Sequence, residues 1–198
     1  MFNKLSFYLI LIIFVTLSYQ KNLLSDELLI EQLSKYIEDL NKFKCNFIQL
    51  NPDGTISEGN MIYSDNKIKI SYLKPSAITF IAREKKAMYF HEDLLELHYF
   101  NPNKTAFSLF TSMFNLTEMP KNSYSINSKN DVINLNFDEI GVDQIVEFSI
   151  FFQNNPIELK KIKWTGESGE SIFSIFNIDK NIEIHKKTFS MVNPILNN

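Results

Sequence analysis

Apolar and polar residues alternate along most of the chain beyond residue 43, in short runs that end at turn residues. Such alternation is typical of strands that bury only one face. One break is Asn51-Pro52-Asp53-Gly54, in which proline presets φ and glycine accepts a positive φ. Breaks that recur about every 9 to 12 residues indicate an all-β sheet. The pattern predicts about 11 strands, at about 44–50, 56–63, 67–73, 77–83, 86–91, 94–100, 122–128, 132–138, 144–153, 157–165 and 170–178.

The central runs also predict which face of the sheet is buried. In the run at 67–73 one face is apolar and the other carries Lys67 and Lys69. The opposite register would bury both lysines at a large desolvation cost, so we expect the apolar face to point inward. The inward residues predicted in this run and the next are Ile68, Ile70, Tyr72, Ile78 and Phe80. In the last run, the residues that alternate on one face are Ile172, Ser174, Phe176 and Ile178.

Two segments show helical spacing instead. The first follows Ser25 or Asp26, either of which can cap a helix, and its apolar residues are Leu29, Leu33, Tyr36, Ile37 and Leu40. This spacing predicts an amphipathic helix that lies against the sheet. The second segment is a short helix after Thr105, and it reaches Leu116.

The second predicted helix has no charged residue over 106–116, although a surface helix normally shows a charged outer face. Phe107, Phe110 and Phe114 are spaced i, i+3 and i+7, so they share one face. The helix is therefore either a lid over an apolar space or an ordinary core helix, and we favour the lid.

The N-terminus predicts export. Lys4 precedes an almost wholly apolar run at 5–17, and a polar region follows. This is the layout of a secretory signal peptide, and the apolar run is short for a membrane span. We predict a signal peptide over 1–20 and one domain over 21–198; the alternative is an uncleaved anchor. The single cysteine, Cys45, allows no internal disulfide and is predicted to be a small buried hydrophobe.

Composition narrows the function classes. The 198 residues include 18 phenylalanines, which indicates large apolar surfaces in a core or around a ligand. The net charge is −3 and no basic block is present, so nucleic acid is not an expected partner. The three histidines lack metal-site spacing, and no glycine-rich phosphate loop or nucleophile elbow occurs. We therefore expect neither a cofactor nor an enzyme.

The order of these motifs resembles one known family. The segments FKCNFIQLNPDGTISEGNMIY and KIKISYLKP, followed by a strand pair that ends at HYFNPN, are similar to the periplasmic lipoprotein carrier (LolA) family over about 25–192. The residues on the family's motif positions are Phe43, Phe47, Gln49, Gly59, Ile70, Tyr72, Pro75, Tyr89 and Tyr99.

This resemblance implies an α+β fold, an unclosed antiparallel β-barrel covered by helices, with an apolar cavity. It implies a soluble, monomeric periplasmic carrier that takes acylated lipoproteins from an inner-membrane lipoprotein-releasing ABC transporter to an outer-membrane receptor. The receptor shares the fold but is itself a lipoprotein, and no cysteine ends the signal segment here. The family has Lys-Arg-Pro-Gly before the third strand, with an arginine linked to holding the lid; here Ser64-Asp65-Asn66 stands there.

The residues predicted to form the acyl-chain cavity and its lid are Phe47, Ile68, Ile70, Tyr72, Ile78, Phe80, Phe107, Phe110, Met113 and Phe114. Two alternatives remain open on the sequence. The first is an exported sensor or interaction module of the same fold that binds a protein partner. The second is an enzyme that uses the mouth of the barrel as its pocket.

Overall fold

The computed structural model describes residues 27–83, 85–120, 123–137 and 145–197, so the predicted signal peptide and the helix caps at Ser25 and Asp26 lie outside the described residues. It confirms a mainly β fold with helices. The strands are β1 (Lys42–Leu50), β2 (Ile56–Ser64), β3 (Lys67–Lys74), β4 (Ile78–Arg83), β5 (Lys86–His91), β6 (Glu96–Phe100), β7 (Tyr124–Lys129), β8 (Val132–Phe137), β9 (Ile145–Gln153), β10 (Glu158–Gly166) and β11 (Gly169–Asp179).

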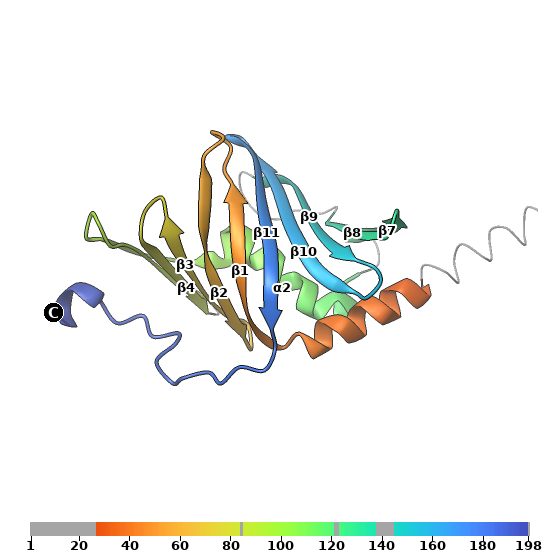
Figure 1. The fold of residues 1–198 in the computed structure, drawn as a ribbon, viewed down its shortest axis with the longest axis horizontal. Coiled ribbons are helices and arrows are strands. Elements are labelled where there is room, and N and C mark those ends of the chain that lie inside the picture. Colours follow the sequence, from red (N-terminus) through yellow and green to blue (C-terminus); the bar gives the residue numbers. More distant parts are fainter. Residues whose placement is uncertain (1–26, 84, 121–122, 138–144, 198) are drawn as a thin grey trace, which may run out of the picture.

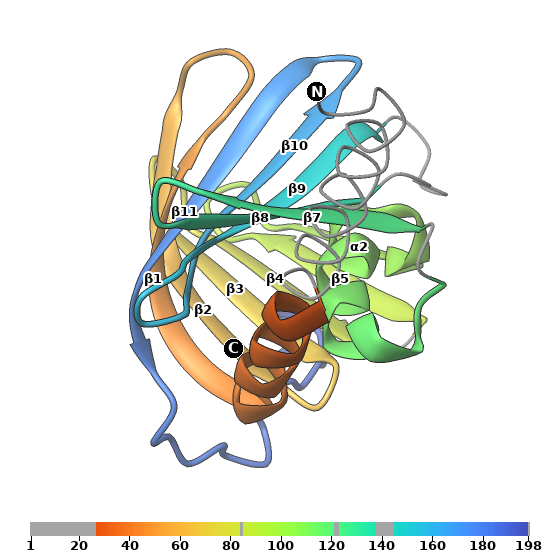
Figure 2. The same ribbon diagram turned by 90° about the vertical axis from the view of Figure 1, so that its right-hand side faces the viewer.

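All of these strands belong to one antiparallel sheet of 11 strands, in the order β6-β5-β4-β3-β2-β1-β11-β10-β9-β8-β7. The first half of the chain forms one meander and the second half forms another, and the two join where β1 pairs with β11. The sheet curls strongly but does not close, and Figure 2 shows the concave face that results. Its two edges are β6 and β7.

The chain crosses between these two edges in a covering segment, residues 102–118. It consists of the 3₁₀ turn η1 (Pro102–Lys104), the helix α2 (Ala106–Ser112) and the 3₁₀ turn η2 (Met113–Glu118), and it lies over the concave face (Figure 2). The α-helix is shorter than predicted, because the backbone continues beyond Ser112 as a 3₁₀ turn. Thr105 occupies the predicted cap position, but its hydroxyl donates to the Pro102 carbonyl oxygen (2.7 Å) and does not cap α2.

The N-terminal helix, described over 27–39, lies across one end of the concave face (Figures 1 and 2). Its predicted apolar stripe is confirmed, since Leu33, Ile37 and Leu40 are buried in the main core cluster. The register of β10 shifts between Leu159 and Lys161, and beside this bulge the Leu159 N–H donates to the Tyr36 hydroxyl oxygen (2.9 Å). Burial raises the pKa of Tyr36 to about 12, so this hydroxyl stays neutral.

The main core fills the concave side of the sheet, and the predicted burial of Cys45 is confirmed. Desolvation raises the pKa of its thiol to about 12, so the thiolate is not populated near neutral pH.

A second, smaller cluster lies on the convex face and was not predicted. The chain after β11 returns along the outside of the sheet without regular structure up to η3 (Pro194–Asn197) (Figure 1). Phe189 and Met191 of this tail pack on Ile81, Met88 and Phe90, and the Tyr99 hydroxyl donates to the Met191 carbonyl oxygen (3.0 Å). The tail therefore buries outward-facing apolar residues of β4 and β5.

Replacing Phe189 with alanine is expected to lower the free energy of unfolding by about 3 kcal/mol, because the ring is 8% exposed and truncation leaves a cavity. The tail should also detach locally, so limited proteolysis should cut after residue 180 while the sheet stays protected. The exposed Val192, replaced with alanine, is the matched control and should leave both measurements unchanged. Equal unfolding free energies and equal proteolysis of the two variants would show that the Phe189 ring does not fix the tail to the convex face.

Candidate functional site

The inward positions of the central strands change from apolar to polar along the sheet. On β1 they run from Phe43, Cys45 and Phe47 to Gln49, and on β2 they run from Tyr63 back to Ser57. The polar residues gather at the end that carries the 51–55 turn, opposite the N-terminal helix (Figure 1). The concave face therefore offers an apolar interior with a polar rim at one end.

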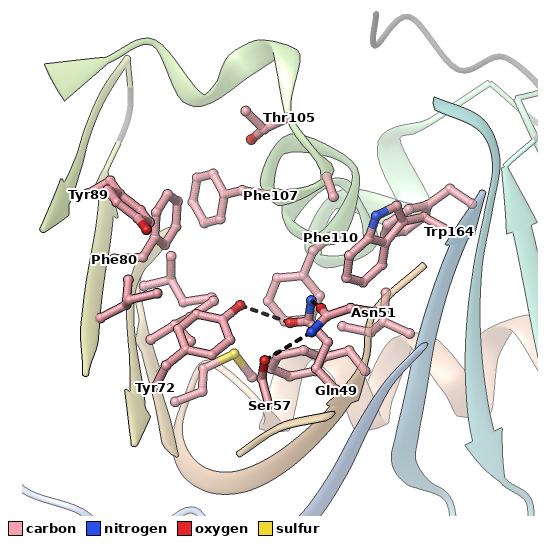
Figure 3. A pocket seen from close by; sticks show the side chains of 18 residues that line it. Gln49, Asn51, Ser57, Tyr72, Phe80, Tyr89, Thr105, Phe107, Phe110 and Trp164 are labelled. Atoms are coloured by element: carbon pink, nitrogen blue, oxygen red, sulfur yellow. Dashed lines mark hydrogen bonds between the residues drawn. The ribbon is translucent and has the colours of Figure 1, made fainter. Parts of the chain in front are cut away.

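Between this face and α2 lies a cavity of about 430 Å³. Its walls come from β1–β5 on one side, from β9–β11 on the other, and from the start of the covering segment (Figure 3). The lining residues are Gln49, Asn51, Ser57, Met61, Ile68, Ile70, Tyr72, Ile78, Phe80, Tyr89, Thr105, Ala106, Phe107, Phe110, Phe148, Ile162, Trp164 and Phe173. None of these described residues carries a formal charge.

The structure brings most of the predicted site residues together at this cavity. Those that line it are Ile68, Ile70, Tyr72, Ile78, Phe80, Phe107 and Phe110. Phe47 lies behind the wall, where it stacks on Phe173 at a centroid distance of 4.2 Å. Met113 is buried in the core, and Phe114 stacks on Tyr63. These last three residues support the walls and do not form them.

The uncharged α2 can lie in apolar surroundings because its hydroxyls bond its own backbone. Ser108 donates to the Thr105 carbonyl oxygen (2.8 Å), and Thr111 and Ser112 both donate to the Ser108 carbonyl oxygen (3.0 and 2.8 Å). The helix thus presents methyl, methylene and aromatic groups to its neighbours. Phe110 is 4% exposed and belongs to the core as well as to the wall, whereas Phe107 is half-buried and contacts Phe80 across the cavity (6.4 Å between ring centroids).

Aromatic stacking on Tyr63 holds the covering segment. The Phe114 ring stacks on Tyr63 at 4.2 Å with an interplanar angle of 9°, and Phe110 meets Tyr63 edge-on at 5.9 Å. Tyr63 is itself fixed, since its hydroxyl donates to Asn66 Oδ1 (2.9 Å). Asp65 and Asn66 both have positive φ (48° and 58°), as a two-residue hairpin turn requires. The turn that lacks the family's arginine therefore anchors the aromatic residue on which the covering segment rests.

A chain of hydrogen bonds joins the polar residues at the rim (Figure 3). The Tyr72 hydroxyl donates to Gln49 Oε1 (2.9 Å), Gln49 Nε2 donates to Asn51 Oδ1 (2.6 Å), and Asn51 Nδ2 donates to Ser57 Oγ (3.0 Å). Burial raises the pKa of Tyr72 to about 12, so its hydroxyl remains a donor at neutral pH.

The sequence reasoning missed the wall that faces β3 and β4. Trp164 and Ile162 of β10 alternate with Lys161 and Lys163, and this alternation was the available signal for an inward face.

Among the described residues no group of histidine, cysteine and carboxylate side chains is arranged to hold a metal ion. No described helix has both the length and the apolar character needed to cross a bilayer.

Comparison with known proteins supports one family. A family model described as "Outer membrane lipoprotein carrier protein LolA" matches residues 38–192. No curated protein matches the chain. An uncharacterized conserved protein from Thermus thermophilus has a similar structure (TM-score 0.55, 8% identity), and the match covers 85% of this chain and 94% of that one. At this identity the likeness shows the fold alone.

Two further solved structures are more distant. One is the MucA/MucB complex of Pseudomonas aeruginosa (TM-score 0.41, 12% identity, 82% of this chain and 59% of that one). The other is LprF from Mycobacterium bovis (TM-score 0.38, 7% identity, 81% of this chain and 96% of that one).

Proposed function

The chain belongs to the outer membrane lipoprotein carrier protein (LolA) family, and we propose that it is an exported carrier of acylated lipoproteins. In this proposal the cavity under α2 shields the acyl chains while the protein moves them through the periplasm. The inner-membrane lipoprotein-releasing transporter loads it, and the outer-membrane receptor unloads it. The single observation that supports this best is an uncharged and mainly apolar cavity, covered by α2, in a member of this family.

The cavity has room for an acyl chain. A methylene group is close in size to a water molecule, which takes up about 30 Å³, so about 14 methylenes need roughly 420 Å³. The cavity measures about 430 Å³. Burying one such chain contributes about 11 kcal/mol at about 0.8 kcal/mol per methylene. Three chains would contribute about 30 kcal/mol, beyond the practical limit of about 20 kcal/mol for reversible binding.

Carriage of a triacylated protein thus requires the covering segment to move outward and the chains to be buried only in part. The stacked contact of Phe114 and the edge-on contact of Phe110 with Tyr63 give this segment a defined closed position. Aromatic pairs contribute about 0.5–1.5 kcal/mol each beyond burial, which is small beside the gain from one acyl chain. Cargo binding is therefore strong enough to drive the opening.

The only tryptophan of the chain, Trp164, lines the cavity and reports its occupancy directly. We expect a synthetic triacylated cysteine peptide with brominated acyl chains to quench Trp164 emission, because bromine quenches on contact. The same peptide with unbrominated chains should instead shift the emission to shorter wavelength. The matched control is the peptide without acyl chains, which should change neither.

Unchanged emission with both acylated peptides, together with no lipopeptide on the protein after gel filtration, would contradict the proposal. A protein-binding module of the same fold would give that result.

A further inference from the structure

The rim of the cavity contains two hydrogen-bond donors that the fold does not use. The amides of Gln49 and Asn51 and the hydroxyl of Tyr72 bond one another, so these groups are satisfied within the protein. In contrast, neither the Trp164 indole N–H nor the Tyr89 hydroxyl has a hydrogen-bond partner among the described residues. Neither atom is among the buried unpaired polar atoms of the described residues, so water can reach both donors in the empty cavity. A ligand that fills the cavity displaces this water, and each donor then needs an acceptor on the ligand.

These two donors lie on opposite walls. Trp164 is on β10 and Tyr89 is on β5, and both rings line the cavity near the hydrogen-bonded rim residues (Figure 3). Figure 3 shows the indole nitrogen and the phenol oxygen turned toward the space between the walls. A ligand that fills the space therefore has a donor on each side, at the end where the interior changes from apolar to polar.

The charge of the lining restricts what these donors can bind. No residue of the lining is formally charged, so a carboxylate or phosphate at this depth would lack a counter-charge and would be strongly destabilised by desolvation. A neutral carbonyl oxygen avoids this cost and accepts one hydrogen bond from each donor.

We propose that Trp164 and Tyr89 bind the ester carbonyl oxygens through which acyl chains join their glyceryl group, so that the carrier recognises the linkage as well as the hydrocarbon. This inference rests on the proposed function, because it assumes that acyl chains occupy the cavity. It assigns a ligand class, neutral acyl esters, and distinguishes them from free fatty acids and from plain alkyl chains.

A competition between two probes tests the assignment. The probes are a triacylated cysteine peptide and its counterpart in which the two ester carbonyls are replaced by methylenes, both offered to the full-length protein in equal amounts. Bound probe is extracted after gel filtration, and the ratio of bound ester probe to bound methylene probe is measured by mass spectrometry. One neutral hydrogen bond corresponds to roughly a fivefold preference. We expect the wild type to favour the ester probe by about fivefold to 25-fold, depending on whether one donor or both engage it.

The variants Tyr89→Phe and Trp164→Phe each keep an aromatic ring and should each lower the ratio, and the double variant should bind both probes alike. Tyr99→Phe is the matched control, because its hydroxyl bonds the C-terminal tail on the convex face, and the ratio should stay as in the wild type. A phosphatidylethanolamine with the same acyl chains forms a third arm, which separates a membrane lipid from a lipoprotein as the source of the ester. We expect the lipopeptide to be retained in preference to it.

A wild-type ratio near one, or an unchanged ratio in a folded double variant, would overturn this inference and leave the carrier function standing. Preferential retention of the phospholipid would overturn the lipoprotein as the source of the ester. If the wild type retains neither lipopeptide, the carrier proposal itself fails, and the two failures are thus distinguishable.

Discussion

Replacing Gly59 with alanine is expected to lower the free energy of unfolding by about 3 kcal/mol or more, measured by denaturant titration. A Cβ atom at this position would clash with the Ser71 carbonyl oxygen and would lie 2.7 Å from Cζ of Phe47. The first is a backbone atom of the neighbouring strand and the second belongs to a ring that stacks on Phe173, so neither can move away cheaply. The thermal midpoint should fall by about 6–12 °C.

The matched control is Gly54→Ala in the 51–55 turn. Gly54 has φ of +82°, and an added methyl group would have nothing within 4 Å, so alanine meets backbone strain there but no clash. We expect a loss of about 1 kcal/mol. Equal losses at the two glycines would show that Phe47 does not lie across β2 at this close distance. Truncating Phe47 to leucine should not rescue Gly59→Ala, because the contact with the Ser71 carbonyl oxygen remains.

Replacing Phe107 with aspartate is expected to weaken binding of the triacylated peptide by about 100-fold or more, since a carboxylate would face the acyl chains without a counter-charge. The side chain is half-buried and contacts Phe80 across the cavity, so the empty protein can hydrate a carboxylate at this place. The thermal midpoint should fall by no more than about 3 °C, equivalent to about 1 kcal/mol.

Phe110→Asp is the matched comparison on the same face of α2. Phe110 is 4% exposed and packs on Tyr63 and Phe114, so a carboxylate there is buried in the core and the midpoint should fall by about 10 °C or more. Comparing the two variants distinguishes a residue of the cavity wall, whose replacement weakens binding, from a residue of the core, whose replacement lowers stability. Full binding by a folded Phe107→Asp variant, or a collapsed midpoint in that variant, would contradict the role we assign to α2.

Much of the fold could be predicted because local rules and the tertiary structure agree. Turn residues mark each strand end, and a wrong register would have buried Lys67 and Lys69; the structure places both on the face away from the cavity. The small boundary errors have local causes. For example, β6 begins at Glu96 and not at residue 94, because Leu95 adopts a positive φ of 54° in the turn.

The remaining features depended on contacts between distant segments. In β11 Ile172, Ser174 and Phe176 face outward, and Phe173 and Ile175 fill the core, because β11 pairs with β1 beside Phe47. Ile178, the last residue of the alternating set, follows Asn177 with its positive φ of 55° and packs against the core instead. Both faces of this run are apolar, so alternation alone did not identify the inner one. The outward Ile81 gave no sign of the C-terminal tail that buries it.

The candidate site, like the fold, could be predicted only in part from the sequence. Alternation and helical spacing identified one wall and the cover, through residues such as Ile70, Tyr72 and Phe107. The polar rim was not identified as a site, since Asn51 and Ser57 are ordinary turn and strand-end residues until the fold brings them beside Gln49. The opposite wall required the pairing of β9, β10 and β11.

The position of β6 and β7 at the two ends of the sheet has a consequence for the width of the concave space. In a closed barrel, strand number and stagger fix the bore, and a wider bore requires another strand. In this molecule the bore instead depends on the covering segment, residues 102–118, which lies over the concave face between the two edges. Insertions or deletions in that connection would change the bore without breaking a single strand pair. Proteins with this architecture can thus widen or narrow the concave space by altering the length of one connection.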